Sequence, residues 1–365
     1  MSVGTTEKIS YRKKKLRQTK NDLKAMKLIY YNGIVGKCHL DYLVWPKNSG
    51  GRRLGELLEH DYLSKSHFCD EYGHKITSMY KINNAGIDFL SKHIEGPLRT
   101  PFDNIPRNGK NSAEAKYREY YQMVELLCQM IDQGLIELDQ WLPARQAKIK
   151  YSLGHRLPFH AIIERDQGND ILFYIDNDGI VKLHNAGNTI KQIKFPNAKR
   201  FYILVDEARI PQLMKFFTRT YPEKDIYFID VGLKDARKKD FTPLLKTYND
   251  PFYFYTELTD RLSHYKGKIA RLPSTSPSSP GPFKFYQDGK ESYLTELISG
   301  SITNLEKLKM TGTTAVPPYR VYAYVPTTEF YTKKMKPLLP KKHAWLHLIA
   351  RDAPKGKDFF NTSRS

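Results

Sequence analysis

Apolar residues recur at helical spacing just after the first twenty residues of the chain. Leu23, Met26 and Ile29 follow Asn21, a residue type that often caps the start of a helix, and Gly33 is suited to end one. A first helix is therefore predicted between Asn21 and Gly33. A second, shorter helix is predicted to end before Pro46 and to contain Cys38, Leu40, Leu43 and Val44.

A third helix is predicted over Arg52–His60, after a polar, glycine-containing turn over Pro46–Gly51. The apolar positions that should face inward are Leu54, Leu57 and Leu58. The polar positions that should face outward are Arg52, Arg53 and Glu56. Such a short helix would present two arginines to solvent from its first turn.

Two short strand-like runs follow this helix, Tyr62–Phe68 and Ile76–Ile82, and the segment between them is polar and contains a glycine. This pattern predicts a β-hairpin, and a further helix is predicted over Asn84–His93. The order of three helices, a hairpin and a helix is typical of a winged helix-turn-helix, a fold that binds duplex DNA.

The segment over residues 95–111 is rich in Pro, Gly, Asn and Arg, and it indicates a linker between two domains. Ser112 is suited to cap a long helix over residues 112–133, which carries an apolar stripe. Two interpretations of the stripe stay open. The favoured one buries it against its own domain, and the other makes it the seam of a homodimer.

The rest of the chain carries strand patterns. Three runs joined by Gln167–Asn169 and Asn177–Gly179 predict an antiparallel meander: Phe159–Arg165, Ile171–Asp176 and Ile180–Leu183. Two strand, helix, strand patterns follow: Arg200–Asp206, Glu207–Thr218 and Asp225–Val231, then Arg320–Val325, Thr327–Leu338 and His343–Arg351. Both patterns begin with similar residues, Arg-Phe-Tyr-Ile-Leu-Val and Arg-Val-Tyr-Ala-Tyr-Val. Shared strand chemistry explains this likeness as well as duplication does, so no repeat is predicted.

The predicted fold class is α+β or α/β with four parts. A basic arm covers residues 1–20 and a winged helix-turn-helix DNA-binding domain covers 21–94. The linker at 95–111 leads to a mixed α/β domain over 112–365, which contains the β-meander, the strand-helix-strand units and a Ser/Pro-rich loop at 272–283. A chain of 365 residues is long enough for two or three domains.

Composition narrows the range of partners. The chain has 59 Lys and Arg against 39 Asp and Glu, a formal net charge of +20, which favours a polyanionic partner. No apolar stretch approaches the roughly 20 residues needed to span a bilayer. We therefore expect no membrane partner, and we expect a cytoplasmic location. The three cysteines suggest no disulfide framework, and a zinc site built from them and nearby histidines would match no standard spacing: Cys38, His39, His67, Cys69 and His74.

The candidate DNA-binding residues fall into three groups. At the start of the third helix, Ser49, Arg52 and Arg53 are placed to reach base edges in the major groove, with Lys47 in the preceding turn. On the predicted hairpin, the candidates for phosphate contacts are Lys65, His67, His74 and Lys75. In the basic arm they are Arg12, Lys13, Lys14, Lys15 and Arg17. For each group, ordinary solvated surface charge is the competing interpretation.

Enzymatic chemistry has weaker support in the sequence. A group of acidic residues around the meander suggests a metal-dependent nuclease, although turn formation already accounts for several of them: Glu164, Asp166, Asp170, Asp176 and Asp178. The sequence contains no GxxxxGK[ST], GxGxxG, HExxH or GxSxG motif. We therefore expect no catalytic residues, no metal and no cofactor.

The region Asn21–His93 resembles the N-terminal part of the replication-relaxation family, found on plasmids and other mobile elements of bacteria. The likeness rests on Asn21-Asp22-Leu23, on Arg52-Arg53-Leu54, and on Met79-Tyr80-Lys81-Ile82 leading into Ala85-Gly86 and Leu90. The resemblance implies a winged helix followed by an α/β region like a restriction-endonuclease core. The chain departs from such a core at Leu157-Pro158-Phe159-His160, which has histidine in place of an acidic residue, and at Ile175-Asp176, which lacks the expected glutamate.

The leading hypothesis is a non-enzymatic, sequence-specific protein that binds double-stranded DNA and belongs to a plasmid, phage or conjugative element. It would act in replication, DNA transfer or transcriptional control. The alternative is a metal-dependent DNA nuclease or nicking enzyme that uses the α/β domain. A protein-interaction scaffold with incidental positive charge is a third reading.

Overall fold

The computed structural model describes residues 19–45, 50–69, 72–94, 110–154, 157–175, 197–205, 225–230, 241–250, 252–263, 267–272, 279–299, 301–311, 319–325, 345–351 and 359–361. The chain divides into two compact units, Met1–Cys128 and Gln129–Ser365. The division lies inside helix α5 (Lys110–Asp132), later than the linker predicted over 95–111. The reason is that α5 packs on the first unit, where the ring of Tyr121 lies 5.1 Å from that of Phe68.

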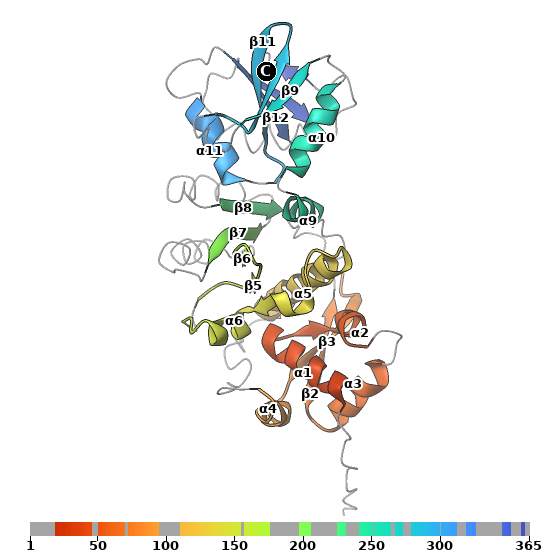
Figure 1. Ribbon diagram of the computed structural model, residues 1–365. Helices are drawn as coiled ribbons and strands as arrows, with labels where there is room; N and C mark the ends of the chain where they lie inside the picture. Colours follow the sequence, from red (N-terminus) through yellow and green to blue (C-terminus); the bar gives the residue numbers. More distant parts are fainter. Residues whose placement is uncertain are drawn as a thin grey trace, which may run out of the picture. The chain divides into compact units, whose positions relative to one another are not determined.

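The first unit contains helices and a small sheet in an order close to the predicted one (Figure 1). Its remaining elements are α1 (Lys20–Asn32), β1 (Val35–Gly36), α2 (Lys37–Leu43), α3 (Gly50–Glu59), β2 (Leu63–Cys69), β3 (Lys75–Ile82) and α4 (Asn84–Leu90). Every helix and strand predicted between Asn21 and His93 is confirmed, with small shifts at the ends, and β1 is an addition. The mixed α+β class of the prediction is confirmed as well.

The start of α1 corrects the predicted cap. Thr19 caps the helix instead of Asn21, because its hydroxyl accepts a hydrogen bond from the Asp22 amide at 3.2 Å. In return, the Asp22 carboxylate accepts one from the Thr19 amide at 2.7 Å, which completes a capping box. At the other end, Gly33 closes the helix as predicted, with φ of 88°.

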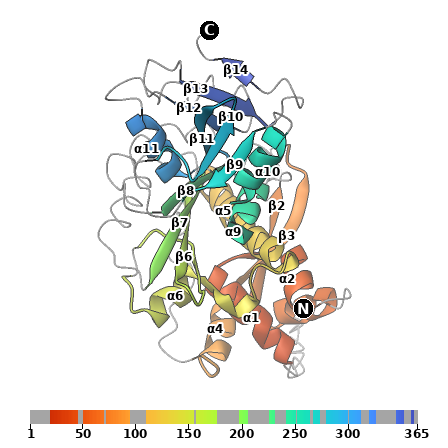
Figure 2. The ribbon, with the colours of Figure 1, turned by 45° about the horizontal axis from the view of Figure 1, so that its top comes forward.

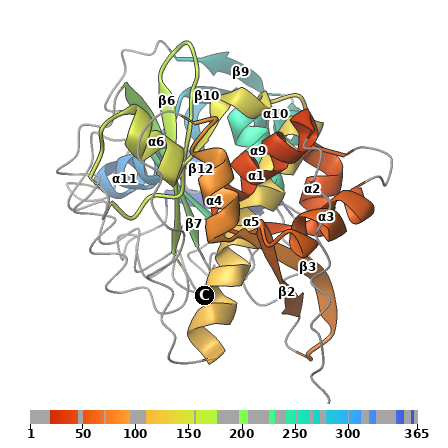
Figure 3. The same cartoon turned by 90° about the horizontal axis from the view of Figure 1, so that it is seen from below.

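The three strands of the first unit form one antiparallel sheet in the order β1-β3-β2. β2 and β3 form a hairpin that extends beyond α1, α2 and α3 (Figure 3). Helix α3 packs on β2, and α1 and α2 pack on β3. The first-unit core is apolar and includes Met26, Ile29, Leu40, Leu54, Leu57 and Met79, all at most 1% exposed.

The second unit contains two sheets (Figure 2). One has the order β4-β5-β6-β7-β8 and consists of Trp141–Pro143, Ala161–Ile163, Asn169–Ile175, Ala198–Val205 and Asp225–Asp230. The other has the order β14-β13-β12-β11-β10-β9, and its strands, numbered from β9 upward, are Lys268–Arg271, Phe283–Gln287, Lys290–Glu296, Arg320–Val325, Leu346–Ala350 and Phe359–Asn361. The helices described in this unit besides the end of α5 are α6 (Ala144–Lys150), α9 (Thr242–Asn249), α10 (Tyr253–Leu262) and α11 (Ile302–Thr311).

The two sheets share one topology. From β4 to β8 the successive pairings are antiparallel, antiparallel, parallel and parallel, and from β9 to β13 they are the same. Arg200 is the third residue of β7, and Arg320 is the first residue of β12, the strand at the corresponding place in the other sheet. The likeness between the two strands therefore extends to their position in the sheet. This agreement favours duplication over the shared strand chemistry that the sequence left as an equal explanation.

The meander prediction is confirmed only in part. β5 and β6 pair antiparallel as expected, but β5 also pairs with β4, which the sequence analysis did not predict. The third predicted strand, Ile180–Leu183, lies outside the described residues, as do both crossover helices, Glu207–Thr218 and Thr327–Leu338. The strands on either side of those helices are confirmed as the parallel pairs β7–β8 and β12–β13.

Much of the apolar stripe of α5 is buried. Over the part of the helix whose side chains are described, five apolar residues are at most 4% exposed: Met123, Val124, Leu126, Leu127 and Met130. Tyr120, Tyr121 and Ile131 are partly exposed. The buried residues of the stripe therefore form a packed face, in line with the favoured interpretation of the sequence. No helix in the described parts of the chain is long and apolar enough to cross a membrane.

Candidate functional site

Helix α3 presents its two arginines in different directions. Leu54 and Leu57 are buried and fix the helix against the core of the first unit. The side chain of Arg52 is 77% exposed, whereas that of Arg53 is only 14% exposed. The prediction that both arginines face outward is therefore wrong for Arg53.

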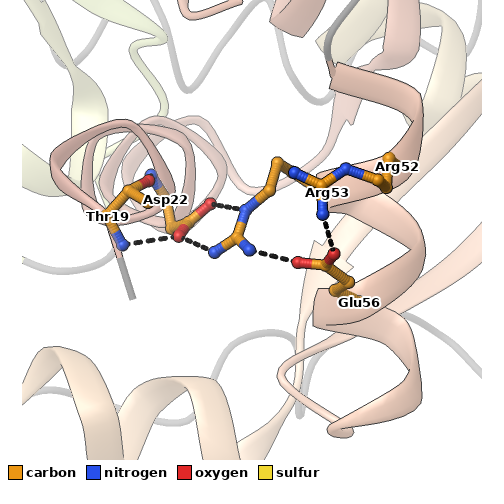
Figure 4. A network of polar contacts seen from close by, with 5 residues as sticks. All are labelled: Thr19, Asp22, Arg52, Arg53 and Glu56. Carbon is orange, nitrogen blue, oxygen red and sulfur yellow. Dashed lines mark hydrogen bonds and ion pairs between the residues drawn. The ribbon is translucent and has the colours of Figure 1, made fainter. Parts of the chain in front are cut away.

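Arg53 joins α3 to the start of α1 through a buried ion pair (Figure 4). Its Nε donates to Asp22 Oδ1 at 3.1 Å, and its other guanidinium nitrogens donate to Asp22 Oδ2 and to Glu56. Asp22 is fully buried, and hydrogen bonding to it raises the pKa of Arg53. The same carboxylate completes the cap of α1, so Arg53 and the capping box form one network.

Arg52 lies on the open side of α3. Its guanidinium donates to Glu56 at 2.6 Å, a pairing one helical turn along the same exposed surface. Its neighbours on this side, Gly51 and Gly55, have no atom within 4 Å of the position that a Cβ would take. Among the described residues, nothing therefore covers the helix at these two glycines, which leaves room for a partner to approach.

The hairpin carries the second group of candidates. Lys65 and His67 lie on exposed positions of β2, and His74 and Lys75 are exposed at the start of β3. Tyr72 lies at the same end of the hairpin, is 77% exposed, and has its ring centroid 6.4 Å from that of His74. β2 is an edge strand of its sheet, so among the described strands only β3 pairs with it.

Several candidates fall outside the described residues. These are Arg12, Lys13, Lys14, Lys15 and Arg17 of the basic arm, and Lys47 and Ser49 of the turn before α3. The described part of the site thus consists of Arg52 on α3 and the hairpin candidates Lys65, His67, His74 and Lys75. Arg53 is not part of it, because its side chain is mostly buried.

Of the described members of the acidic group proposed for a nuclease, Glu164 and Asp170 are paired with cations, and Asp166 is exposed. Asp170 is fully buried and accepts two hydrogen bonds from Arg200, at 2.8 and 2.7 Å, with Arg165 3.6 Å away. Both carboxylate oxygens of Glu164 accept from Lys150 at 2.7 Å, and Tyr151 donates to Glu164 as well. Pairing of this kind leaves little negative charge for a metal ion.

The rest of that group gives no metal site either. Asp176 and Asp178 lie outside the described residues. Among the residues that are described, no three His, Cys, Asp or Glu side chains are grouped to hold a metal ion. The Cys and His residues considered for zinc are therefore not assembled into such a group.

A hydrogen bond between His39 and Glu125 was not predicted from the sequence. The ring of His39 is 2% exposed and its Nε2 lies 3.0 Å from Glu125 on α5. Because 86 positions separate the two residues, no local pattern would have indicated the pair.

No protein-family model, curated protein or solved structure matches the chain.

Proposed function

We propose that the chain is a protein that binds double-stranded DNA through its first unit, and that this unit is a winged helix-turn-helix. The observation that carries the proposal is the joint arrangement of α1, α2 and α3 with the β1-β3-β2 sheet, together with exposed cationic side chains on α3 and on the hairpin. In folds of this class the helix before the hairpin enters the major groove and the hairpin contacts the backbone.

Each part of the site then has a chemical role. On DNA, Arg52 would release its hydrogen bond to Glu56 and donate a bidentate pair of hydrogen bonds to the edge of a guanine. Gly51 and Gly55 would let the helix lie deep in the groove, because neither carries a side chain. Lys65, His67, His74 and Lys75 would contact phosphates, and the net charge of +20 would favour the encounter with DNA.

The sequence-level resemblance extends the proposal to a biological setting. The protein would act on a plasmid, phage or conjugative element, in replication, DNA transfer or transcriptional control. Selection of bound sequences from a random duplex pool would discriminate among these roles. Repeated sites beside a replication origin, a transfer origin or a promoter in the native replicon would each identify one of them.

The second unit is proposed to be a non-catalytic relative of a restriction-endonuclease-like core. Support comes from the order along the chain: the long helix α5, of which only the end lies in this unit, is followed by the antiparallel strands β4–β6 and the parallel strand β7. The pairing of Asp170 with Arg200 supports the absence of catalysis.

The test of the DNA-binding site compares two single charge deletions on the full chain. Arg52→Ala removes the proposed base contact, and Lys92→Ala removes an exposed cation just after α4, on neither α3 nor the hairpin strands. We expect Arg52→Ala to weaken binding to the selected sequence by about 1–3 kcal/mol and to broaden the sequence preference, with little change for Lys92→Ala. Equal affinity and preference in the two variants would overturn the assignment of Arg52.

A further inference from the structure

The first unit holds a cysteine beside a buried histidine and a carboxylate. Cys38 and His39 are consecutive residues of α2, and Glu125 reaches them from α5. Thr77 of β3 and Tyr121 of α5 complete the surroundings of the thiol. These five residues are called the Cys38 cluster, and none of them has a role in the proposed contacts with DNA.

The histidine of the cluster is held in place on two sides. Its Nε2 makes a 3.0 Å hydrogen bond with Glu125, and its ring packs on that of Tyr121 with centroids 4.7 Å apart. Burial disfavours the charged ring, but interactions with Cys38 and Glu125 outweigh it and raise the pKa of His39 to about 8. His39 is therefore mainly protonated at neutral pH.

The second ring nitrogen of His39 lies on the same side of Gly36 as the sulfur. Nδ1 is buried and has no hydrogen-bond partner. The position that a Cβ on Gly36 would occupy lies 3.2 Å from this nitrogen and 3.5 Å from Cys38 Sγ. The two atoms therefore lie against the same side of Gly36, together with Thr77 Cγ2 at 3.3 Å from that position, and Cys38 is exposed to solvent.

The environment of the sulfur favours its ionised form. Burial opposes loss of the proton, but interactions with the neighbouring His39, Thr77 and Tyr121 outweigh it, so the pKa of Cys38 is lowered. The titratable groups that face the thiol are His39 from its own helix and Tyr121 and Glu125 from α5. Only the imidazolium among these is positively charged at neutral pH.

We propose that Cys38 is a reactive thiol, activated by His39 and Glu125, that takes part in covalent exchange with small disulfides. The thiolate attacks one sulfur of a disulfide RSSR′, a Cys38–S–S–R bond forms, the S–S bond of the reagent breaks, and R′S⁻ leaves with the electron pair. The disulfide is the oxidant, so the step balances. A small thiol reverses it by the same exchange.

The other cysteines supply an internal control. Cys69 is also exposed, lies in the same unit on β2, and has no comparable histidine and carboxylate pair described beside it. Exposure alone would make Cys38 and Cys69 equally reactive. The proposal requires Cys38 to react at lower pH.

The experiment follows alkylation of the folded, full-length protein by iodoacetamide from pH 5.5 to 9.5, with each cysteine read by peptide mass spectrometry. We expect the rate at Cys38 to rise at lower pH than the rate at Cys69, with about a tenfold advantage at pH 7 if the two midpoints differ by one unit. A second arm uses glutathione disulfide at pH 7 and should give a mixed disulfide at Cys38 first.

Two variants separate activation from accessibility. Glu125→Gln keeps the side-chain volume at a position that is 34% exposed, and it should move the Cys38 midpoint up toward that of Cys69. His39→Gln should have a larger effect in the same direction, provided that circular dichroism shows it folded. If the alkylation rates of Cys38 and Cys69 have the same pH midpoint in the wild-type protein, the proposal is wrong. This test does not depend on whether the variants fold. This outcome would leave the DNA-binding proposal untouched.

Discussion

Replacing Arg53 by methionine is the sharpest perturbation of the first unit. Methionine keeps most of the aliphatic length of the arginine but removes the guanidinium that pairs with Asp22 and Glu56. Asp22 would then remain fully buried and charged, with the Thr19 amide at 2.7 Å as one remaining donor. The matched control is Arg52→Met, which removes the same group one position earlier from a side chain that is 77% exposed.

The expected costs differ widely. Breaking a buried ion pair by removing one partner costs about 3–5 kcal/mol. The cap bond to Thr19 and the position of Asp22 in the first turn of α1 offset part of this, so we expect the lower end of that range. The exposed contact between Arg52 and Glu56 is worth less than about 1 kcal/mol.

Hydrogen exchange followed by mass spectrometry suits a chain with two units, because it reports each element separately. A loss of about 3 kcal/mol corresponds to roughly 150-fold faster exchange of the most protected amides in α1 and α3. A second variant, Asp22→Asn with Arg53→Met, removes the buried charge and should recover part of the protection. Equal exchange in Arg53→Met and Arg52→Met would refute the structural role assigned to Arg53.

Three further predictions concern the described residues. Gly55→Ala should stabilise α3 by about 0.5–1 kcal/mol, measured by hydrogen exchange, because a Cβ there meets open space; equal protection would contradict this. Arg200→Met should cost about 3–5 kcal/mol, seen as faster exchange in β6 and β7, since Asp170 would stay buried with only Arg165, 3.6 Å away, as a cationic neighbour. Burial, and then repulsion from Arg145, lowers the pKa of Lys148 to about 8. Between pH 8 and 10 the unfolded chain therefore binds more protons than the folded chain does, and the free energy of unfolding should rise with pH. Lys148→Met should flatten that rise in urea unfolding curves, and an unchanged slope would count against the shift.

The sequence predicted the elements of the first unit because each one is encoded locally. Helical spacing, a glycine at the end of α1 and two strand runs around a polar turn were enough to locate them. The cap of α1 was displaced by two positions because Thr19 and Asn21 are both good caps, and the Asp22 carboxylate selects the first of them.

Arg53 shows what the sequence could not supply. Buried positions Gly50, Leu54 and Leu57 recur at helical spacing, and Arg53 falls on the same stripe. Its charge suggested exposure, because the buried partner that satisfies it, Asp22, lies 31 positions away. The contact of His39 with Glu125 was missed for the same reason. Long-range pairs of this kind depend on the tertiary fold.

The position of the boundary between the two units depends on tertiary packing, which local sequence patterns do not show. The composition of residues 95–111 indicated a break there, but packing of Tyr121 on Phe68 joins most of α5 to the first unit. Composition marks where a chain is easy to interrupt, whereas contacts across a helix decide to which unit it belongs.

The central claim is that the first unit binds duplex DNA through α3 and the hairpin, and salt-dependent affinity tests it most directly. Fluorescence anisotropy of a labelled random duplex, titrated with the full chain at salt concentrations from about 50 to 300 mM, gives the slope of log affinity against log salt. The account predicts measurable binding at low salt and a negative slope, reduced by about one for each phosphate contact removed in Lys65→Ala and Lys75→Ala. No binding at low salt, or a slope that these variants leave unchanged while Lys92→Ala reduces it, would contradict the account.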